Sequence, residues 1–310
     1  MPPPKPDSNS RASFDNPDFP VNTPRMPIVN AADIVTTAHE EGYAVVQVNT
    51  NGGNDDLTRA IVEVADEMRS PVILGAYEAN LAYRGVEYAA MVMRWYAERA
   101  DAPVAVHLDH GSRPDVCRAA LDAGFTSVMI DGSHLPIDEN IALVRQVVDD
   151  ARSAGAGVEA EVGELQRLDP DGSMSEVKNL SDPAEVARIC RETGLDMLAV
   201  GIGNAHGFYR GRPDIRLDLL ETLAEAATVP LVLHGGTGLE RDVVAGSIER
   251  GIAKVNLGTL IRTRYVQFTA DAIAAQEHQN HPWRVAQVVV ERVKPLIREF
   301  LEYAGSANRV

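Results

Sequence analysis

The 310-residue chain is poor in aromatic residues and has no long hydrophobic run. Phe, Trp and Tyr make up only 5% of its residues, whereas hydrophobic residues make up 45%, so the predicted core is aliphatic. A core of Val, Ala, Leu and Ile is typical of buried parallel strands covered by helices. No apolar run approaches the roughly 18–20 residues needed to cross a bilayer. We therefore expect a globular protein with no membrane partner.

Basic residues and cysteines are also few. The 29 Lys and Arg residues face 45 Asp and Glu residues, which gives a formal charge of −16. This charge argues against nucleic-acid binding, but an anionic small substrate can still be held by local backbone N–H groups. The two cysteines, Cys117 and Cys190, lack metal-type spacing and indicate a reducing compartment. Since the first residues have no apolar signal segment, we expect a cytoplasmic protein.

One pattern repeats through most of the chain. Residues 1–28 are rich in Pro, Ser, Asp and Asn and are predicted to form a loosely ordered N-terminal arm. After the arm, short β-branched runs alternate with amphipathic segments. The expected strands are 44–49, 71–76, 104–109, 127–131, 157–162, 197–201, 231–234 and 253–257. The expected helices are 55–69, 87–99, 114–122, 137–151, 183–192, 217–227, 241–250, 260–275 and 283–303.

Eight strand–helix units within about 250 residues indicate an α/β protein with a (β/α)₈ TIM barrel over residues 29–310. A doubly wound open sheet is the alternative. Such a sheet usually begins with a glycine-rich G-x-G-x-x-G turn, and none follows the first expected strand. No shift in composition marks a second domain, so we expect a single catalytic domain behind the arm.

Polar residues gather where the expected strands end. In a (β/α)₈ barrel these carboxyl ends meet at one face, which carries the active site. Asp109 and His110 end the third strand, His206 follows the sixth, and His234 ends the seventh. Three neutral imidazoles with one open position form a common catalytic Zn²⁺ site. Each histidine alone could instead pack or cap, but together they predict a zinc site.

Other polar residues at these ends have several interpretations. Asp131 and Glu161 could orient the histidines or bind a second cation, or they could be interior carboxylates paired with Lys254. His107 shares a strand face with Asp109 and is predicted to be buried. We expect His134 to pack in the loop after the fourth strand. The remaining histidines are expected to be solvated: His39, His278 and His281.

The last two strands end in sequences typical of phosphate binding. Backbone N–H groups of Gly235-Gly236-Thr237 can converge on an anion, since glycine allows close approach. Thr259 lies near the start of the following helix, whose dipole favours an anion. Loops after strands 7 and 8 often bind phosphate in this fold. We therefore expect a phosphorylated small molecule as the substrate.

Six motifs occur in one order along the chain. They are His107-Leu108-Asp109-His110-Gly111, Ser127 to His134, Val158-Glu159-Ala160-Glu161, Ala205-His206-Gly207, Leu233 to Gly238, and Lys254-Val255-Asn256. As a set, these motifs resemble the class II, zinc-dependent fructose-bisphosphate and tagatose-bisphosphate aldolases. The resemblance extends from about residue 29 to the closing Gly305-Ser306-Ala307-Asn308.

The resemblance implies a (β/α)₈ barrel, dimeric or tetrameric, that cleaves a ketose phosphate. By position, His110, His206 and His234 would bind the catalytic Zn²⁺, and Asp109 would transfer a proton. Asp131 and Glu161 match positions that can hold a second divalent or monovalent cation. The implied site for dihydroxyacetone phosphate consists of Gly207, Gly235, Gly236, Thr237, Asn256, Leu257, Gly258 and Thr259, and Asn49 ends the first strand beside it.

Three departures from the family pattern concern the aldehyde half of the substrate. The usual mobile-loop acid is missing after strand 5, where Glu164, Asp169 or Asp171 are candidates to replace it. Tyr77 stands where a serine is frequent, and Gly258 where fructose-bisphosphate enzymes often have Asp. Candidate cations for a second phosphate are Arg59, Arg210, Arg212, Arg262 and Arg264. A sugar-phosphate epimerase or isomerase, or a non-catalytic sugar-phosphate-binding protein, remains an alternative.

Overall fold

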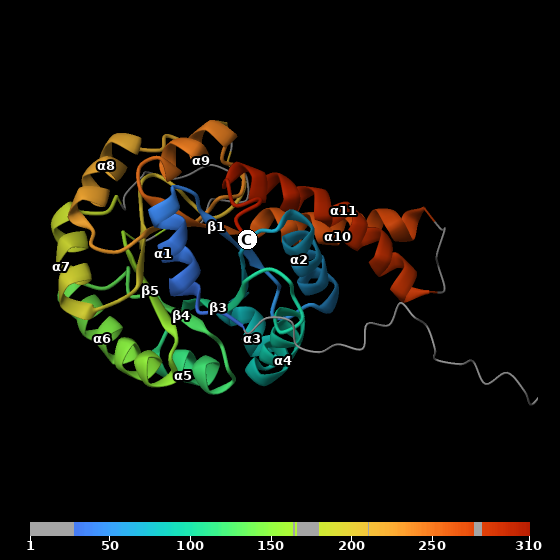
Figure 1. Cartoon of the computed structure of the whole chain (residues 1–310), viewed down its shortest axis with the longest axis horizontal. Coiled ribbons are helices and arrows are strands. Elements are labelled where there is room, and N and C mark those ends of the chain that lie inside the picture. Colours follow the sequence, from blue (N-terminus) through green and yellow to red (C-terminus); the bar gives the residue numbers. More distant parts are fainter. Residues whose placement is uncertain (1–27, 164, 166–179, 210, 276–280) are drawn as a thin grey trace, which may run out of the picture.

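The structure, a computed structural model, describes residues 28–163, 165, 180–209, 211–275 and 281–310. Eight parallel strands close into a barrel in sequence order (Figure 1). The strands are β1 (Val45–Asn49), β2 (Val72–Tyr77), β3 (Val104–Gly111), β4 (Ser127–Ile130), β5 (Gly157–Val162), β6 (Met197–Val200), β7 (Leu231–Leu233) and β8 (Ile252–Leu257). The predicted (β/α)₈ barrel is confirmed, whereas residues 1–27 of the predicted arm lie outside the described residues.

Eleven helices are formed by the described residues. They are α1 (Ala31–Glu41), α2 (Asp55–Met68), α3 (Glu78–Arg84), α4 (Val86–Ala97), α5 (Pro114–Asp122), α6 (Ile137–Ala154), α7 (Pro183–Thr193), α8 (Leu217–Ala226), α9 (Arg241–Ile248), α10 (Thr259–Ala274) and α11 (Pro282–Tyr303). All nine predicted helices are present, with ends that differ by a few residues. Helices α1 and α3 were not predicted.

Helix α1 closes the barrel at the end opposite the polar strand ends. The Asn30 side chain accepts a hydrogen bond from Ala32 N and caps the helix at its start. The apolar face of α1, including Ile34, Val35 and Ala38, packs on barrel residues such as Val45 and Met197. Burial of this face is the main stabilisation for so short a helix. The barrel is therefore filled at one end and open to ligands only at the other.

The barrel interior changes from apolar to polar along its axis. Gln47, His107, Glu159 and Lys254 are all buried, and the residues two positions further along each strand are Asn49, Asp109, Glu161 and Asn256. Since side chains two apart on a strand point to the same side, these eight form two successive polar layers. The outer layer faces the pocket described below.

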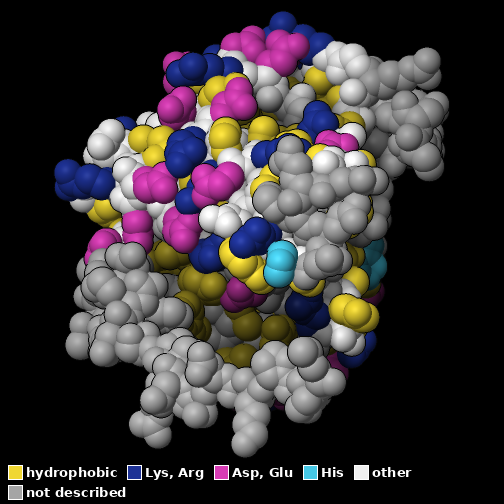
Figure 2. Space-filling model, turned by 90° about the vertical axis from the view of Figure 1, so that its right-hand side faces the viewer, with side chains coloured by type: hydrophobic (Ala, Val, Ile, Leu, Met, Phe, Trp, Pro, Cys, Tyr) yellow, Lys and Arg dark blue, Asp and Glu magenta, His cyan; other side chains and the backbone are white. Residues whose placement is uncertain are grey.

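The last two helices form a hairpin that extends to one side of the barrel (Figure 1). No helix among the described residues is both long enough and apolar enough to cross a membrane. Acidic and basic side chains are interspersed on the described upper part of the face that Figure 2 shows. Cys117 lies in α5 and Cys190 in α7, and both are buried free thiols, as the helical positions predicted.

Candidate active site

A pocket of about 710 Å³ opens at the carboxyl ends of the strands. It contains residues that follow β1, β2, β3, β4, β6, β7 and β8, as expected for the active-site face of this fold. The described residues that line it are Gln47, Asn49, Asn51, Tyr77, Glu78, Ala79, Ala82, Asp109, His110, Ser112, Asp131, His134, Leu165, His206, Gly207, Gly235, Thr237, Asn256, Leu257, Gly258, Thr259 and Arg262.

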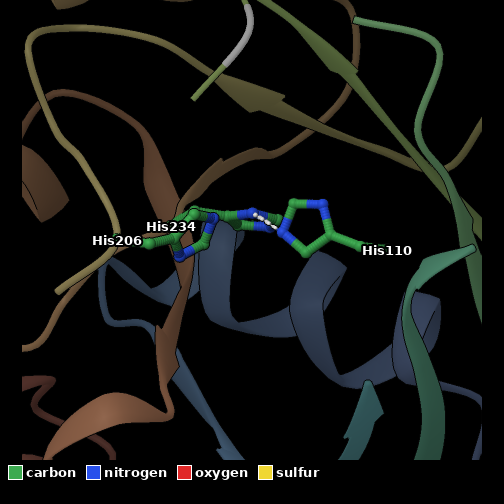
Figure 3. A group of neighbouring side chains, drawn as sticks. All are labelled: His110, His206 and His234. Carbon is green, nitrogen blue, oxygen red and sulfur yellow. Dashed lines mark hydrogen bonds between the residues drawn. The ribbon is translucent and has the colours of Figure 1, made fainter. Parts of the chain in front are cut away.

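Three histidines converge at the inner end of this pocket, from β3, the segment after β6, and the residue after β7 (Figure 3). His110 Nε2 lies 3.1 Å from His234 Nδ1, and the ring centroid of His206 lies 5.1 Å from that of His110. One nitrogen from each ring lies within 4.8 Å of the other two. Two nitrogens bound at 2.0–2.1 Å to a tetrahedral ion are about 3.3 Å apart, so this donor set fits Zn²⁺.

An irregular end of β3 lets two consecutive residues face the pocket. Neighbouring side chains on a regular strand point to opposite sides. Here His110 has φ +52°, and the pairing of β3 with β4 shifts register between Leu108 and Gly111. This left-handed conformation is uncommon for a residue with a side chain. It allows His110 to line the pocket beside Asp109.

Two carboxylates fix which nitrogen of each imidazole faces the other histidines. His110 Nδ1 is 2.8 Å from Asp131 Oδ2, so its Nε2 is left for a metal. His234 Nε2 is 2.7 Å from Glu159 Oε1, so its Nδ1 is left for a metal. Such outer partners orient metal-binding histidines and raise their basicity. The opposite use of the two rings follows from the positions of the two acids.

The same contacts shift the protonation of the histidines. Burial opposes the charged form of His110, but the hydrogen bond to Asp131 and nearby negative charges hold its pKa above the ordinary 6.5. Burial lowers the pKa of His234, against the effect of Glu159. A metal ion must displace the proton from His110, so metal binding and pH are coupled at this site.

A second group of possible ligands adjoins the first. His110, Asp131 and Glu161 also bring one donor atom each within 4.8 Å of the others. Glu161 Oε1 accepts from Leu165 N at 3.0 Å, while its Oε2 lies 3.4 Å from His234 Nδ1. Burial and the Asp131 charge raise the pKa of Glu161 to about 8. Lys254 is paired with Glu159, at 2.8 Å, and not with either of these acids.

Asp109 is held by two side-chain amides. Asn256 Nδ2 donates to Asp109 Oδ1 at 3.2 Å, and Asn49 Nδ2 lies 3.4 Å from Oδ2. Burial would raise the pKa of Asp109, but the charges of the neighbouring histidines and of Lys254 lower it to about 2. The carboxylate form is therefore maintained next to the histidine cluster, where it can accept a proton.

The glycine-rich ends of β7 and β8 form the opposite side of the pocket. Of the nine residues predicted for substrate and phosphate binding, all except Gly236 line the pocket. Gly236 instead donates its N–H to Asn256 O at 3.1 Å. Gly235 has φ +68°, and a Cβ there would lie 2.3 Å from Ala205 O, so only glycine fits. Thr237 Oγ1 accepts from Leu260 N at 3.1 Å and so ties this loop to the start of α10.

The other sequence candidates are distributed as follows. His107 is buried, as predicted, with Nδ1 2.7 Å from Ser127 Oγ. The expectation for His134 was wrong: it is exposed and lines the pocket, because the turn after β4 faces the barrel mouth. Arg262 lines the pocket, whereas Arg59 pairs with Glu63 and Arg212 with Asp242. Arg210, His278 and the mobile-loop candidates Glu164, Asp169 and Asp171 lie outside the described residues.

Sequence reasoning missed two sets of residues around the site. It gave no role to Glu159, although its position two residues before Glu161 on β5 was a usable sign that both point inward. It also missed the pocket wall formed by Glu78, Ala79 and Ala82. These belong to α3, whose seven residues are too few for a helical period to stand out.

Comparison with known proteins relates the chain to aldolases over almost its full length. The family model "Fructose-bisphosphate aldolase class-II" matches residues 29–309. A "Probable fructose-bisphosphate aldolase" of Bacillus subtilis (strain 168) is 38% identical over 287 residues, which is 92% of this chain and 100% of that protein. A "6-phospho-5-dehydro-2-deoxy-D-gluconate aldolase" of Bacillus licheniformis is 37% identical over 287 residues, 92% of this chain and 97% of that protein.

A solved structure gives the same assignment. The YdjI aldolase of Escherichia coli K12 superposes with a TM-score of 0.77 at 28% identity, covering 91% of this chain and 99% of that one. Both the sequence relatives and this structure are named aldolases, which are lyases that act on a carbon–carbon bond. The chain belongs to the class II fructose-bisphosphate aldolase family.

Proposed function

We propose that this protein is a zinc-dependent aldolase that reversibly cleaves a ketose 1-phosphate or ketose 1,6-bisphosphate to dihydroxyacetone phosphate and an aldehyde. The observation that carries the proposal is the convergence of three imidazoles beside the Asp109 carboxylate, in one pocket with the glycine-rich ends of β7 and β8. The first group supplies metal ligands and the second supplies backbone N–H groups for a phosphate.

The metal's part in this proposal is limited to polarisation. Zn²⁺ bound by His110, His206 and His234 supplies a Lewis acid for the substrate ketone. The protein holds the ligands in register through Asp131 and Glu159, which contact the far nitrogens of two rings. His234 is fully buried, so a substrate approaches from the side of His110 and His206, which line the pocket.

Asp109 performs the proton transfer in this scheme. The carbon–carbon bond breaks only when the departing hydroxyl loses its proton, and the Asp109 carboxylate takes that proton. In the condensation direction the same group returns it to the aldehyde oxygen. Asn49 and Asn256 keep the carboxylate directed at the pocket by donating to its two oxygens. The acid that handles the proton at the carbon is proposed to come from Glu164, Asp169 or Asp171.

The phosphate is assigned to Gly207, Gly235, Thr237 and the Asn256–Thr259 segment. Their positions on one side of the pocket favour a ketone whose phosphate lies one carbon away, as in dihydroxyacetone phosphate. The relatives named for 6-phospho-5-dehydro-2-deoxy-D-gluconate fit the same half, since position 5 of that compound is a ketone next to the phosphorylated position 6. We therefore include that acid as a second candidate substrate.

The test is a cleavage assay with fructose 1,6-bisphosphate, tagatose 1,6-bisphosphate and 6-phospho-5-dehydro-2-deoxy-D-gluconate. Dihydroxyacetone phosphate release is followed through a coupled NADH-dependent reductase, with and without a chelator. We expect release from at least one substrate, which the chelator stops and Zn²⁺ restores. His206→Ala should abolish both zinc retention and turnover. A change of sugar configuration without carbon–carbon cleavage would support the epimerase alternative and contradict the proposal.

Three further assignments remain proposals of the same scheme. Asp131 and Glu161 are proposed to bind a second divalent or monovalent cation, which activity titrations with K⁺ and Mg²⁺ would detect. The protein is proposed to form a homodimer or homotetramer, which light scattering would measure. The division into an arm at residues 1–28 and a catalytic domain at 29–310 predicts that removal of the arm leaves cleavage intact.

A further inference from the structure

A lysine is buried inside the barrel next to the site. Lys254 lies on β8 with no exposed surface. Its Nζ is 2.8 Å from Glu159 Oε2 and donates to Asn256 Oδ1 at 2.7 Å. Burial of a charged ammonium is costly unless it is paired and hydrogen-bonded, and both conditions hold here. The ion pair with Glu159 explains why the charge is tolerated, but the contact with Asn256 is additional.

The contact with Asn256 determines the orientation of the amide. An ammonium group can only donate hydrogen bonds, so the Asn256 oxygen must face Lys254. The NH₂ group then faces the other way and donates to Asp109 Oδ1 at 3.2 Å. If the amide were turned over, its oxygen would face the Asp109 carboxylate, and two acceptors would be in contact. Lys254 excludes this arrangement.

We propose that Lys254 is a positioning residue that acts through the Asn256 amide to hold Asp109 in the geometry for proton transfer. The chain of contacts runs from Lys254 Nζ through Asn256 to Asp109, with each step at hydrogen-bond distance. Asn49 is the only other printed donor to this carboxylate among the described residues, and at 3.4 Å it is the longer contact. The inference rests on the proposed role of Asp109.

The competing explanation is that Lys254 only neutralises Glu159. A single Lys254→Met change does not separate the two, because it leaves the Glu159 charge buried and unpaired. The double variant Lys254→Met/Glu159→Gln removes both charges, and Gln at 159 keeps an oxygen for His234. The matched control is Glu159→Gln alone, which keeps Lys254 and therefore the orientation of Asn256. Comparison of the two isolates the effect of the lysine.

Activity is measured at saturating zinc, after metal content and thermal unfolding have been recorded for each variant. We expect the double variant to have a kcat on the order of 10² lower than Glu159→Gln, the effect of a misplacement of about 1 Å at a reacting group, with KM nearly unchanged. In an Asn256→Ala background, loss of Lys254 should have no further effect on kcat. An equal kcat for the double variant and Glu159→Gln would overturn the proposal, as would an equal loss in the Asn256→Ala background.

A second readout does not depend on turnover. The Asn256 side-chain NH₂ gives a pair of ¹⁵N–¹H signals that are assigned by their absence in Asn256→Ala. We expect these signals to move in the double variant and to stay close to their wild-type positions in Glu159→Gln. Unmoved signals in the double variant would contradict the orienting role of Lys254. If wild-type protein releases no dihydroxyacetone phosphate, the proposed function fails, but the NMR comparison still reports on the amide.

Discussion

Asp131→Asn should weaken zinc binding by changing the tautomer of His110. Asp131 Oδ1 accepts from Ser133 N at 3.1 Å and from Ser133 Oγ at 2.7 Å, while Oδ2 contacts His110 Nδ1 at 2.8 Å. In the variant, the two Ser133 donors keep the amide oxygen on their side. The NH₂ group then faces His110 Nδ1 and requires that nitrogen to accept. The proton moves to Nε2, the nitrogen that faces His234 and the proposed metal.

The size of the effect follows from the contact that is lost. Replacement of a metal ligand's outer partner costs about 10–100-fold in metal affinity, which corresponds to roughly 1.4–2.7 kcal/mol. The His110–Asp131 pair is short and mostly shielded, with side chains 13% and 24% exposed, so the upper half of that range is expected. Zinc affinity would be measured by competition with a chromophoric chelator at fixed pH.

The matched control is Ser133→Ala, which removes one donor to Asp131 Oδ1 but keeps the carboxylate on His110. We expect its zinc affinity to remain within about threefold of wild type, since the His110 tautomer is unchanged. The reasoning would be refuted if Asp131→Asn bound zinc as tightly as the control.

Three other predictions follow from the pocket. Arg262→Gln should raise the KM for the phosphorylated substrate roughly tenfold, because Arg262 lines the pocket one helical turn after Thr259; Arg264→Gln, exposed on the same helix and outside the pocket lining, is the control and should change KM less than twofold. Apparent zinc affinity should keep rising with pH above 7, by up to about tenfold per pH unit, because the raised pKa of His110 means that a proton still competes there; isothermal titration between pH 6 and 8.5 checks this, and a plateau at pH 7 would contradict it. Gly235→Ala should destabilise the fold by more than Gly155→Ala in chemical denaturation: both glycines have φ near +70°, which costs about 1–2 kcal/mol, but only at Gly235 does a Cβ meet backbone, 2.3 Å from Ala205 O, whereas at Gly155 nothing lies within 4 Å. Equal losses for the two glycine variants would show that the contact with Ala205 is relieved without cost.

Much of the fold could be predicted because the barrel repeats. Each strand is a short buried run and each covering helix has an apolar stripe, so the eight units were recognised with ends that differ by one to three residues. Helix α1 was missed because it precedes the first strand and belongs to no repeat. Helix α3 was missed because it is a single short insertion after β2. Local patterns carry no information on such additions until they pack against the barrel.

The site was predictable only in part, for reasons of backbone geometry. The three histidines were expected at one mouth because parallel strands all end there. That Asp109 and His110 both face the pocket depends on the positive φ of His110 and the register shift in β3, which a period of two does not predict. Pairing of Lys254 with Glu159 depends on the stagger of β5 and β8 across the barrel, which is a property of the closed sheet.

The measurement that tests the central claim most directly needs no knowledge of the aldehyde. Purified protein is incubated with dihydroxyacetone phosphate in D₂O, with and without a chelator, and loss of one C3 hydroxymethyl proton is followed by NMR. We predict stereospecific exchange that the chelator stops and added Zn²⁺ restores. Binding of dihydroxyacetone phosphate to zinc-loaded protein without any exchange would contradict the proposed chemistry and favour a binding role.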